Sequence, residues 1–363
     1  MQKKLCEISS PKQWKTISSD MLIADGYPVY GANGIIGYFT EYNHECETLL
    51  ITCRGATCGA LNICQPYSYV NGNAMALDNL SDDVDIKYLY YYLLNRGLSD
   101  VITGSAQPQI VRQSLDKVIV EYPSLSKQKE IASNLNRIEE LISFRTSQLS
   151  KLDELVKSRF IELFGDPVLN QYNWDVVTIG DIVTDVRYGT SRPATEGGKY
   201  PYLRMNNLTF DGHLDLSDLK YIDIPENEIE KCIVRKGDVL FNRTNSIELV
   251  GKTCVFDLEE DMVIAGYIIR VRLNEKVLPI VLSSYMNSTV LKEQLRSMAK
   301  GAVNQANINA QELQSIKIYL PPLDLQNEFA TFVEQTDKLK FEVKEALEKL
   351  EILKKSLMQQ YFG

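Results

Sequence analysis

The feature that most constrains this chain is an internal repeat with a constant offset of 198 residues. Residues 157–165 and 355–363 resemble each other and both end in Phe-Gly, so that Gly165 corresponds to Gly363 (363 − 165 = 198). The same offset relates further pairs, which are Leu152 and Leu350, Leu149 and Leu347, Gln128 and Gln326, Leu125 and Leu323, and Pro123 and Pro321. One unit of about forty residues is therefore used twice, and both copies are expected to adopt the same structure.

Each copy of the repeat is predicted to be a long helix. Ser126 and Asp324 stand at corresponding positions where an N-cap is expected, just before the apolar pattern begins. Gly165 is followed two residues later by Pro167, a combination that typically ends a helix.

Apolar residues in each predicted helix are spaced alternately three and four residues apart. In the first copy these positions are Leu135, Ile138, Ile142, Arg145, Leu149, Leu152 and Val156. In the second copy they are Leu339, Val343, Ala346, Leu350, Leu353 and Leu357. This narrow seam is typical of a coiled coil, so the two helices are expected to pack against each other. The alternative is that each helix lies on its own globular part.

The repeat divides the chain into two globular parts and two helices. We predict an α+β protein with a pseudo-twofold internal repeat, in which two mixed α/β domains are separated by two long helices forming an antiparallel coiled coil. The domains are residues 1–123 and 166–321, and the helices are residues 124–165 and 322–363.

Both globular parts follow one plan of short strands, glycine turns, one helix and a polar loop before a last strand. The helices of this plan are expected at residues 85–95 and 279–295. Residues 207–234 have no counterpart of similar length in the first part. The two parts thus share their helices, terminal strands and glycine turns, and they differ most in the stretch from residue 207 to residue 234.

Composition limits the class of protein. No run approaches 18 apolar residues, and the first residues lack the apolar core of a signal peptide, so we expect a cytoplasmic protein. Seven cysteines without a framework spacing fit a reducing compartment. The net charge of −9 argues against a nucleic-acid partner, but it is a sum over the whole surface and does not exclude a basic face.

The sequence offers little that could perform catalysis. There are two histidines, and neither a Gly-x-Gly-x-x-Gly motif nor a phosphate-binding loop is present. Cys46, Cys53, Cys58 and Cys64 lie close together in the sequence, but without a Cys-x-x-Cys pair a zinc site is a weaker interpretation than small buried side chains. These features predict no metal site and favour binding over catalysis.

The polar loops of both parts carry residue types that read the edges of DNA bases. Asn and Gln can form two hydrogen bonds with adenine, and Arg can do the same with guanine. The candidate DNA-binding residues are Asn33, Arg54, Gln107, Gln109, Arg204, Asn206, Arg243, Asn245, Asn304 and Gln305. Each of them could equally be an ordinary polar loop residue, but their recurrence at corresponding places in both parts favours a function.

Several motifs together carry a resemblance to a known family. They are the helix starts at residues 123–128 and 321–326, the Phe-Gly helix ends, and the stretches 27–31 and 235–240. By these motifs the chain resembles the specificity (S) subunit of type I restriction-modification systems. The resemblance implies that each globular part is a target recognition domain for one half of a bipartite DNA site. It also implies that the helices set the gap between the half-sites.

The resemblance further implies partners for a chain that is not itself an enzyme. Two methyltransferase (M) subunits would dock on the helices and bring S-adenosylmethionine for adenine methylation. A motor-nuclease restriction (R) subunit would bring ATP and magnesium. The alternative function is a protein–protein adaptor on the same coiled-coil scaffold, which the acidic charge favours. A nuclease built on Asp211, Asp218 and Lys220 is disfavoured, because Asp-x-Lys is common by chance.

Overall fold

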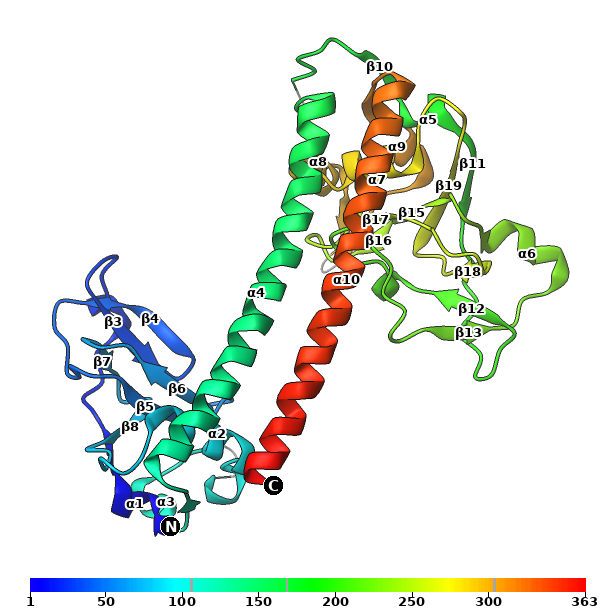
Figure 1. Ribbon diagram of the computed structural model, residues 1–363. Helices are drawn as coiled ribbons and strands as arrows, with labels where there is room; N and C mark the ends of the chain where they lie inside the picture. Colours follow the sequence, from blue (N-terminus) through cyan, green and yellow to red (C-terminus); the bar gives the residue numbers. More distant parts are fainter. Residues whose placement is uncertain (105–106, 168, 303–304) are drawn as a thin grey trace. The chain divides into compact units, whose positions relative to one another are not determined.

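Figure 1 shows the computed structural model, which describes all residues except 105–106, 168 and 303–304. The contacts divide the chain into two compact units. Unit 1 consists of residues 1–146 and 344–363, and unit 2 consists of residues 147–343. Each unit therefore contains one globular part together with one portion of each long helix. Within the described residues, no helix combines the length and the apolarity needed to cross a membrane.

Within its described residues, unit 1 contains three small sheets. The first pairs β1 (Gln2–Lys4) with β9 (Ile119–Glu121). The second has the order β2 (Ser10–Gln13), β8 (Ala74–Asp78), β5 (Thr48–Thr52) and β6 (Leu61–Cys64), and all its neighbours are antiparallel. The third has the order β4 (Gly34–Phe39), β3 (Tyr27–Gly31) and β7 (Tyr69–Val70). The helices of this globular part are α1 (Leu5–Ile8), η1 (Ser19–Met21), α2 (Ile86–Arg96), η2 (Ser99–Val101) and α3 (Arg112–Leu115).

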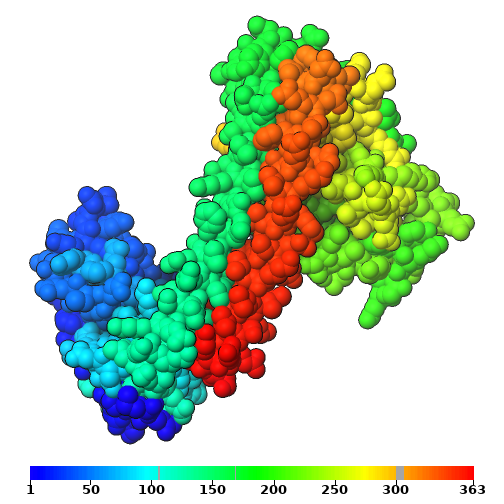
Figure 2. Space-filling model, viewed as in Figure 1, coloured from blue at the N-terminus to red at the C-terminus, as the bar shows by residue number. Residues whose placement is uncertain are grey.

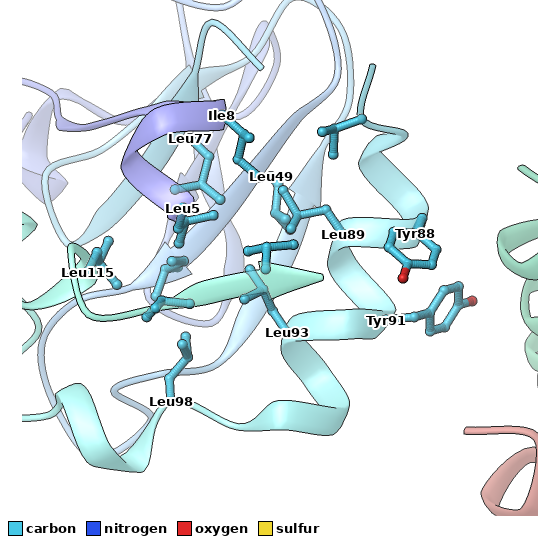
Figure 3. Close-up of a cluster of buried hydrophobic side chains, with 14 of the residues drawn as sticks. Leu5, Ile8, Leu49, Leu77, Tyr88, Leu89, Tyr91, Leu93, Leu98 and Leu115 are labelled. Atoms are coloured by element: carbon cyan, nitrogen blue, oxygen red, sulfur yellow. The ribbon is translucent and has the colours of Figure 1, made fainter. Parts of the chain in front are cut away.

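Helix α2 closes the core of unit 1, and its existence confirms the helix predicted at residues 85–95. Asp85 caps it by accepting hydrogen bonds from the backbone N–H groups of Lys87 and Tyr88, and Gly97 follows its end with a φ of +70°. Figure 3 shows Leu89 and Leu93 of α2 among the buried side chains of α1, β5 and β8. Burial of this apolar cluster is the main source of stability for the unit.

Unit 2 repeats this arrangement with more strands. One sheet pairs β10 (Asp175–Thr178) with β22 (Lys317–Leu320). A second has the order β11 (Val183–Tyr188), β19 (Ile268–Leu273), β15 (Val239–Asn242) and β17 (Thr253–Val255). A third has the order β13 (Lys220–Ile222), β12 (Tyr200–Leu203), β18 (Met262–Ile264) and β14 (Ile233–Val234). The last has the order β16 (Thr244–Asn245), β21 (Gln305–Asn307) and β20 (Lys300–Ala302).

The short helices of unit 2 are α5 (Ile179–Ile182), η3 (Met205–Asn207), α6 (Glu226–Cys232), α7 (Pro279–Met286), α8 (Thr289–Met298) and α9 (Ala310–Gln314). The single helix predicted at residues 279–295 is wrong, because α7 and α8 are separate. Asn287 ends α7, and the Ser288 side chain accepts a hydrogen bond from the Leu291 N–H at the start of α8. Serine and asparagine compete with the helical backbone for hydrogen bonds, and this favours a break.

The two long helices are α4 (Leu125–Phe164) and α10 (Leu323–Phe362), each of 40 residues. They begin before the predicted N-caps, because the Gln128 N–H already donates to the Ser124 carbonyl and the Gln326 N–H to the Pro322 carbonyl. Ser126 and Asp324 therefore lie in the first helical turn and are not the N-caps. The predicted end of α4 is confirmed, since Gly165 has a φ of +85° and its N–H donates to the Ile161 carbonyl.

A buried glutamine fastens the start of each long helix to its globular part. Gln128 Nε2 donates to the carbonyls of Asp83 and Pro123, and its Oε1 accepts from the Asp85 N–H. In unit 2 the same three bonds are formed by Gln326, whose partners are Lys276, Pro321 and Leu278. Both glutamines are fully buried. The repeat therefore preserves a complete hydrogen-bonded fastening as well as a sequence.

Ion pairs give the register of the long helices within each unit. In unit 1 Lys354 Nζ lies 2.6 Å from Glu139 Oε1, and in unit 2 Lys340 Nζ lies 2.7 Å from Asp153 Oδ1. In both pairs the residue numbers have the same sum (139 + 354 = 493 and 153 + 340 = 493). A constant sum is the register of an antiparallel pair, so the predicted antiparallel packing is confirmed. In Figure 2 the side chains of α4 and α10 lie against each other.

The seam predicted for the first helix is confirmed, and so is most of the seam predicted for the second, because Val343 is buried and Ala346, Leu350 and Leu357 are half-buried. Leu339 and Leu353 are 51% and 46% exposed. The buried positions of α10 are Gln326, Phe329, Val333, Thr336, Lys340, Val343 and Met358, so the seam begins earlier than predicted. An offset of 198 from the first seam leads to Val333, Thr336 and Lys340. Thr336 and Lys340 are polar, so the apolar pattern in the sequence does not show this part of the seam. They can be buried because the Thr336 hydroxyl donates to the Phe332 carbonyl of its own helix and Lys340 forms an ion pair with Asp153.

Candidate nucleic-acid interface

The candidate residues of unit 1 are brought together where β5 ends. Arg54 forms an antiparallel bridge with Gln109, which lies in the loop that also carries Gln107. Asn33 stands in the turn between β3 and β4, and its Oδ1 accepts a hydrogen bond of 2.6 Å from Thr57 Oγ1, three residues beyond Arg54. Arg54, Gln107, Gln109 and Asn33 are all exposed. The fold thus assembles an exposed polar surface from three loops.

In unit 2, Arg243 and Asn245 follow β15 in the corresponding way. Asn245 Nδ2 donates to Asn242 Oδ1 over 2.9 Å, and Asn245 Oδ1 accepts from the Ser246 N–H. The strand β16 that contains Asn245 pairs with β21, which begins at Gln305. The Gln305 side chain is not described, and Asn304 lies outside the described residues.

Hydrogen bonds refine the correspondence between the two units. The Ile110 N–H donates to the Cys53 carbonyl, and the Ile308 N–H donates to the Arg243 carbonyl, with 110 + 198 = 308. Arg243 therefore occupies the position of Cys53, one residue away from the equivalent of Arg54. Successive side chains of a strand point to opposite faces, so this shift places the two arginines differently on the repeated frame.

Arg204 and Asn206 form a separate group in unit 2. Arg204 Nη2 donates to Asp218 Oδ2 over 2.7 Å, so its charge is already neutralised. Asn206 is exposed in η3. The buried side chain of Lys252 holds this segment, because its Nζ donates to the carbonyls of Leu208 and Met205. Within the described part of unit 2, no hydrogen bond joins these residues to Arg243 or Asn245.

Arg243 is held by a residue that the sequence did not indicate. Its guanidinium Cζ lies 4.9 Å from the centre of the Tyr188 ring, in the geometry of a cation–π contact. Tyr188 ends β11, and its hydroxyl accepts a hydrogen bond of 2.8 Å from the Ala310 N–H. The two residues are 55 positions apart (243 − 188 = 55), so no local pattern relates them. Thr57, which is 24 positions from Asn33, was missed for the same reason, and Asp218 was considered only as part of a nuclease site.

The cysteines do not gather at one place. Cys53 packs in the large cluster of unit 1 with Leu49 and Ile51, whereas Cys64 packs in another cluster with Tyr30. Burial raises the pKa of both thiols above the ordinary value. Among the residues that the structure describes, no three His, Cys, Asp or Glu side chains are grouped to hold a metal ion.

Comparison with protein families gives a match over most of the chain. The family model described as type I restriction modification DNA specificity domain matches residues 2–154 and again residues 171–353. The two matched segments correspond to the two copies of the internal repeat.

Curated relatives carry the same description. A putative type I restriction enzyme specificity subunit of Methanocaldococcus jannaschii is 30% identical over 52% of this chain and 45% of its own length. The EcoKI specificity subunit of Escherichia coli is 23% identical over 74% of this chain and 62% of its own length. A putative specificity subunit of Haemophilus influenzae is 24% identical over 92% of this chain and 86% of its own length. The chain thus matches less than two thirds of the length of the first two relatives.

A solved structure shares the fold. The S subunit of a type I restriction-modification system from M. genitalium aligns over 100% of this chain and 96% of its own, with a TM-score of 0.67 and 16% identity. A structure described under the assembly and conformational transition of the type I system aligns with a TM-score of 0.57 and 17% identity. At these identities the likeness concerns the fold alone.

Proposed function

The chain belongs to the family of type I restriction modification DNA specificity domains, and we propose that it is the specificity subunit of a type I restriction-modification complex. In this proposal residues 1–123 and 166–321 are target recognition domains, and each reads one half of a bipartite DNA site. The helices at residues 124–165 and 322–363 set the gap between the half-sites. The chain itself is not an enzyme.

The observation that carries the proposal is the recurrence of polar loops with an arginine on the same backbone frame. In both units a central strand is followed by an arginine within two residues and is tied to the returning polar loop by the Ile110 or Ile308 N–H. Arginine, asparagine and glutamine side chains in such loops can read base edges, whereas backbone and charged groups position the duplex. A duplicated reading surface suits a site with two half-sites.

The proposed partners are two methyltransferase subunits. Leu141 and Leu353 in unit 1 and Leu155 and Leu339 in unit 2 are exposed leucines of the long helices. They correspond at the repeat offset (141 + 198 = 339 and 155 + 198 = 353), so each unit presents the same apolar pair. Equal surfaces favour two copies of one partner. Apolar side chains exposed on a helix gain free energy when a partner covers them.

The proposed complex would receive its cofactors from the partners. S-adenosylmethionine would be bound by the methyltransferase subunits for adenine methylation, and ATP and magnesium by a restriction subunit. We place the complex in the cytoplasm, a reducing compartment in which the seven unpaired cysteines stay reduced.

The first experiment separates DNA recognition from the alternative of a protein adaptor. The chain is copurified with its neighbouring subunits, and its affinity for duplex DNA is measured between 50 and 200 mM salt, a range over which several phosphate contacts lose roughly 10³-fold or more in affinity. Sequencing of the methylated sites in the host genome should then reveal a motif split by a constant gap. Salt-independent binding, or methylation without a split motif, would reject the proposal in favour of the adaptor.

The second experiment tests the helices as the spacer. Seven residues are inserted after residue 147 in α4 and after residue 345 in α10. These two positions lie nearly opposite each other, because their numbers add up to 492 and residues paired across the two helices add up to 493. One heptad keeps the seams in register and adds about 10.5 Å, which is about three base pairs. The half-site sequences should stay the same while the gap lengthens by about three base pairs.

The matched control inserts four residues at the same two positions. Four residues rotate the seams out of register, so this variant should lose stability and methylation. An active heptad variant that keeps the original gap would show that the helices are not the spacer.

A further inference from the structure

Arg243 is one of two arginines in the described part of unit 2 that have no carboxylate partner. Among the described residues of this unit, every arginine except Arg243 and Arg296 forms an ion pair with Asp or Glu. The paired arginines are Arg159, Arg187, Arg192, Arg204, Arg235, Arg270 and Arg272. Although the chain is rich in carboxylates, the guanidinium of Arg243 has no carboxylate partner and can therefore bind an acceptor on a ligand.

The backbone around Arg243 is fixed before any ligand binds. Its N–H donates to the Tyr267 carbonyl over 2.9 Å, and its carbonyl accepts from the Ile308 N–H over 2.9 Å. The next residue, Thr244, donates from Oγ1 to Asn307 Oδ1. These bonds join three separate segments of unit 2 at one residue, so the Cα–Cβ direction of Arg243 is determined by the sheet and does not depend on a free loop.

The side chain of Arg243 is also restrained. The Tyr188 ring supports the guanidinium at 4.9 Å, and the Tyr188 hydroxyl is tied to the Ala310 N–H. Arg243 Nε is buried and has no hydrogen-bond partner. A buried donor without an acceptor is unfavourable. Arg159, Arg204 and Arg270 also have a buried Nε without a partner, but each of these three forms an ion pair through a terminal nitrogen.

Resting on the function proposed above, we propose that Arg243 reads a guanine in the half-site of unit 2 and that Tyr188 is the positioning residue that orients its guanidinium. The two terminal nitrogens of a guanidinium form a planar fork that matches the O6 and N7 acceptors of guanine in the major groove. Contact with a DNA phosphate, in contrast, requires only a positive charge and no fixed orientation of the side chain. Arg296, exposed on α8 without an ion pair or a supporting ring, has that character.

The test uses the full chain copurified with its methyltransferase subunits. The complex methylates a plasmid library with randomised half-sites, and sequencing of the methylated molecules gives the preference at every position. Arg243→Lys should remove the preference for one G·C pair in one half-site, a loss of roughly 5- to 150-fold in discrimination. The other half-site should not change.

Variants of Tyr188 separate positioning from mere stability. Tyr188→Leu removes the ring and should relax the same G·C position, whereas Tyr188→Phe keeps the ring and should retain most of the preference. The controls are Tyr221→Leu and Arg296→Met. Tyr221 is a matched tyrosine, because it is 45% exposed and Tyr188 is 43% exposed. Both controls should leave the half-site sequences unchanged.

Four outcomes would overturn the inference. An unchanged motif in Arg243→Lys would show that Arg243 does not read a base. A uniform loss at all positions, with the salt slope reduced by about 0.9, would assign Arg243 to a phosphate. Relaxation at other positions in Tyr188→Leu would reduce Tyr188 to a structural role. A wild-type complex without any split motif would instead refute the proposed function together with the inference.

Discussion

Replacement of Gln326 by methionine should destabilise unit 2 by about 4 kcal/mol. Methionine has a similar volume, so the substitution leaves little cavity, but it removes three hydrogen bonds. The Leu278 N–H and the carbonyls of Lys276 and Pro321 lose their partner. At roughly 1–2 kcal/mol for each group left without a partner, the sum is about 3–6 kcal/mol.

Thermal unfolding and hydrogen exchange measure this effect. For a unit of this size 1 kcal/mol corresponds to roughly 2–4 °C, so the transition of unit 2 should fall by about 8–16 °C. Exchange at the Leu278 amide should accelerate at least about tenfold, while the Asp85 amide, protected by Gln128, should keep its rate. Gln128→Met should produce the opposite pattern. Gln335→Met, at an exposed position of α10, is the matched control and should change neither rate.

A small effect on stability, or an equal effect on both units, would refute the claim that each glutamine holds the start of a long helix to its own unit. If Gln326→Met lowers the free energy of unfolding by less than about 1 kcal/mol, the three bonds do not hold the helix start. If both amides accelerate equally, the glutamines act on the whole chain and not on their own unit.

Two further predictions concern charges in unit 2. A double-mutant cycle of Lys340→Met with Asp153→Asn should give a coupling energy of about 1–2 kcal/mol, because the lysine side chain is only 10% exposed. The exposed pair Lys338 and Glu334 should couple by less than about 0.5 kcal/mol, and equal couplings would contradict the buried register. Burial, with Lys252 and Arg296 nearby, lowers the pKa of Lys292 from 10.5 to about 8, so the unfolded chain binds more protons between these pH values. The stability of unit 2 relative to Lys292→Met should therefore rise by up to about 3 kcal/mol from pH 8 to 10.5, and a flat difference in urea titrations would refute the burial of a charged amine.

The repeat allowed the helices to be located from the sequence but not their full register. Gly165, the seam from Leu135 to Val156 and the antiparallel packing were predicted correctly. The second seam was predicted correctly at Val343, Ala346, Leu350 and Leu357, whereas its start was missed, because polar Thr336 and Lys340 occupy seam positions there. Leu339 and Leu353, which were predicted to lie in the seam, are exposed. A polar residue can occupy a seam when a partner satisfies it, and Asp153 is such a partner for Lys340.

The sequence predicted which loops carry candidate DNA-binding residues, but it did not predict how the side chains of these loops are arranged. Residue type was enough to select Asn33, Arg54 and Gln109, and the fold brings these three together. It was not enough to tell Arg204 from Arg243, since both are arginines in polar loops. Their difference depends on Asp218 and Tyr188, which the sheets of unit 2 bring to them.

The sequence by itself determined the duplicated architecture, the position of both long helices and the family to which the chain is similar. These properties depend on patterns that recur along the chain, and the spacing of the apolar residues and the repeat offset of 198 residues are enough to detect them. The tertiary structure alone decided which leucines of α10 are covered, which glutamines hold the starts of the helices and which of the described arginines of unit 2 lack an ion pair. Those properties depend on contacts between residues 40 to more than 200 positions apart. Such contacts are fixed by packing, and no local pattern in a single sequence encodes them.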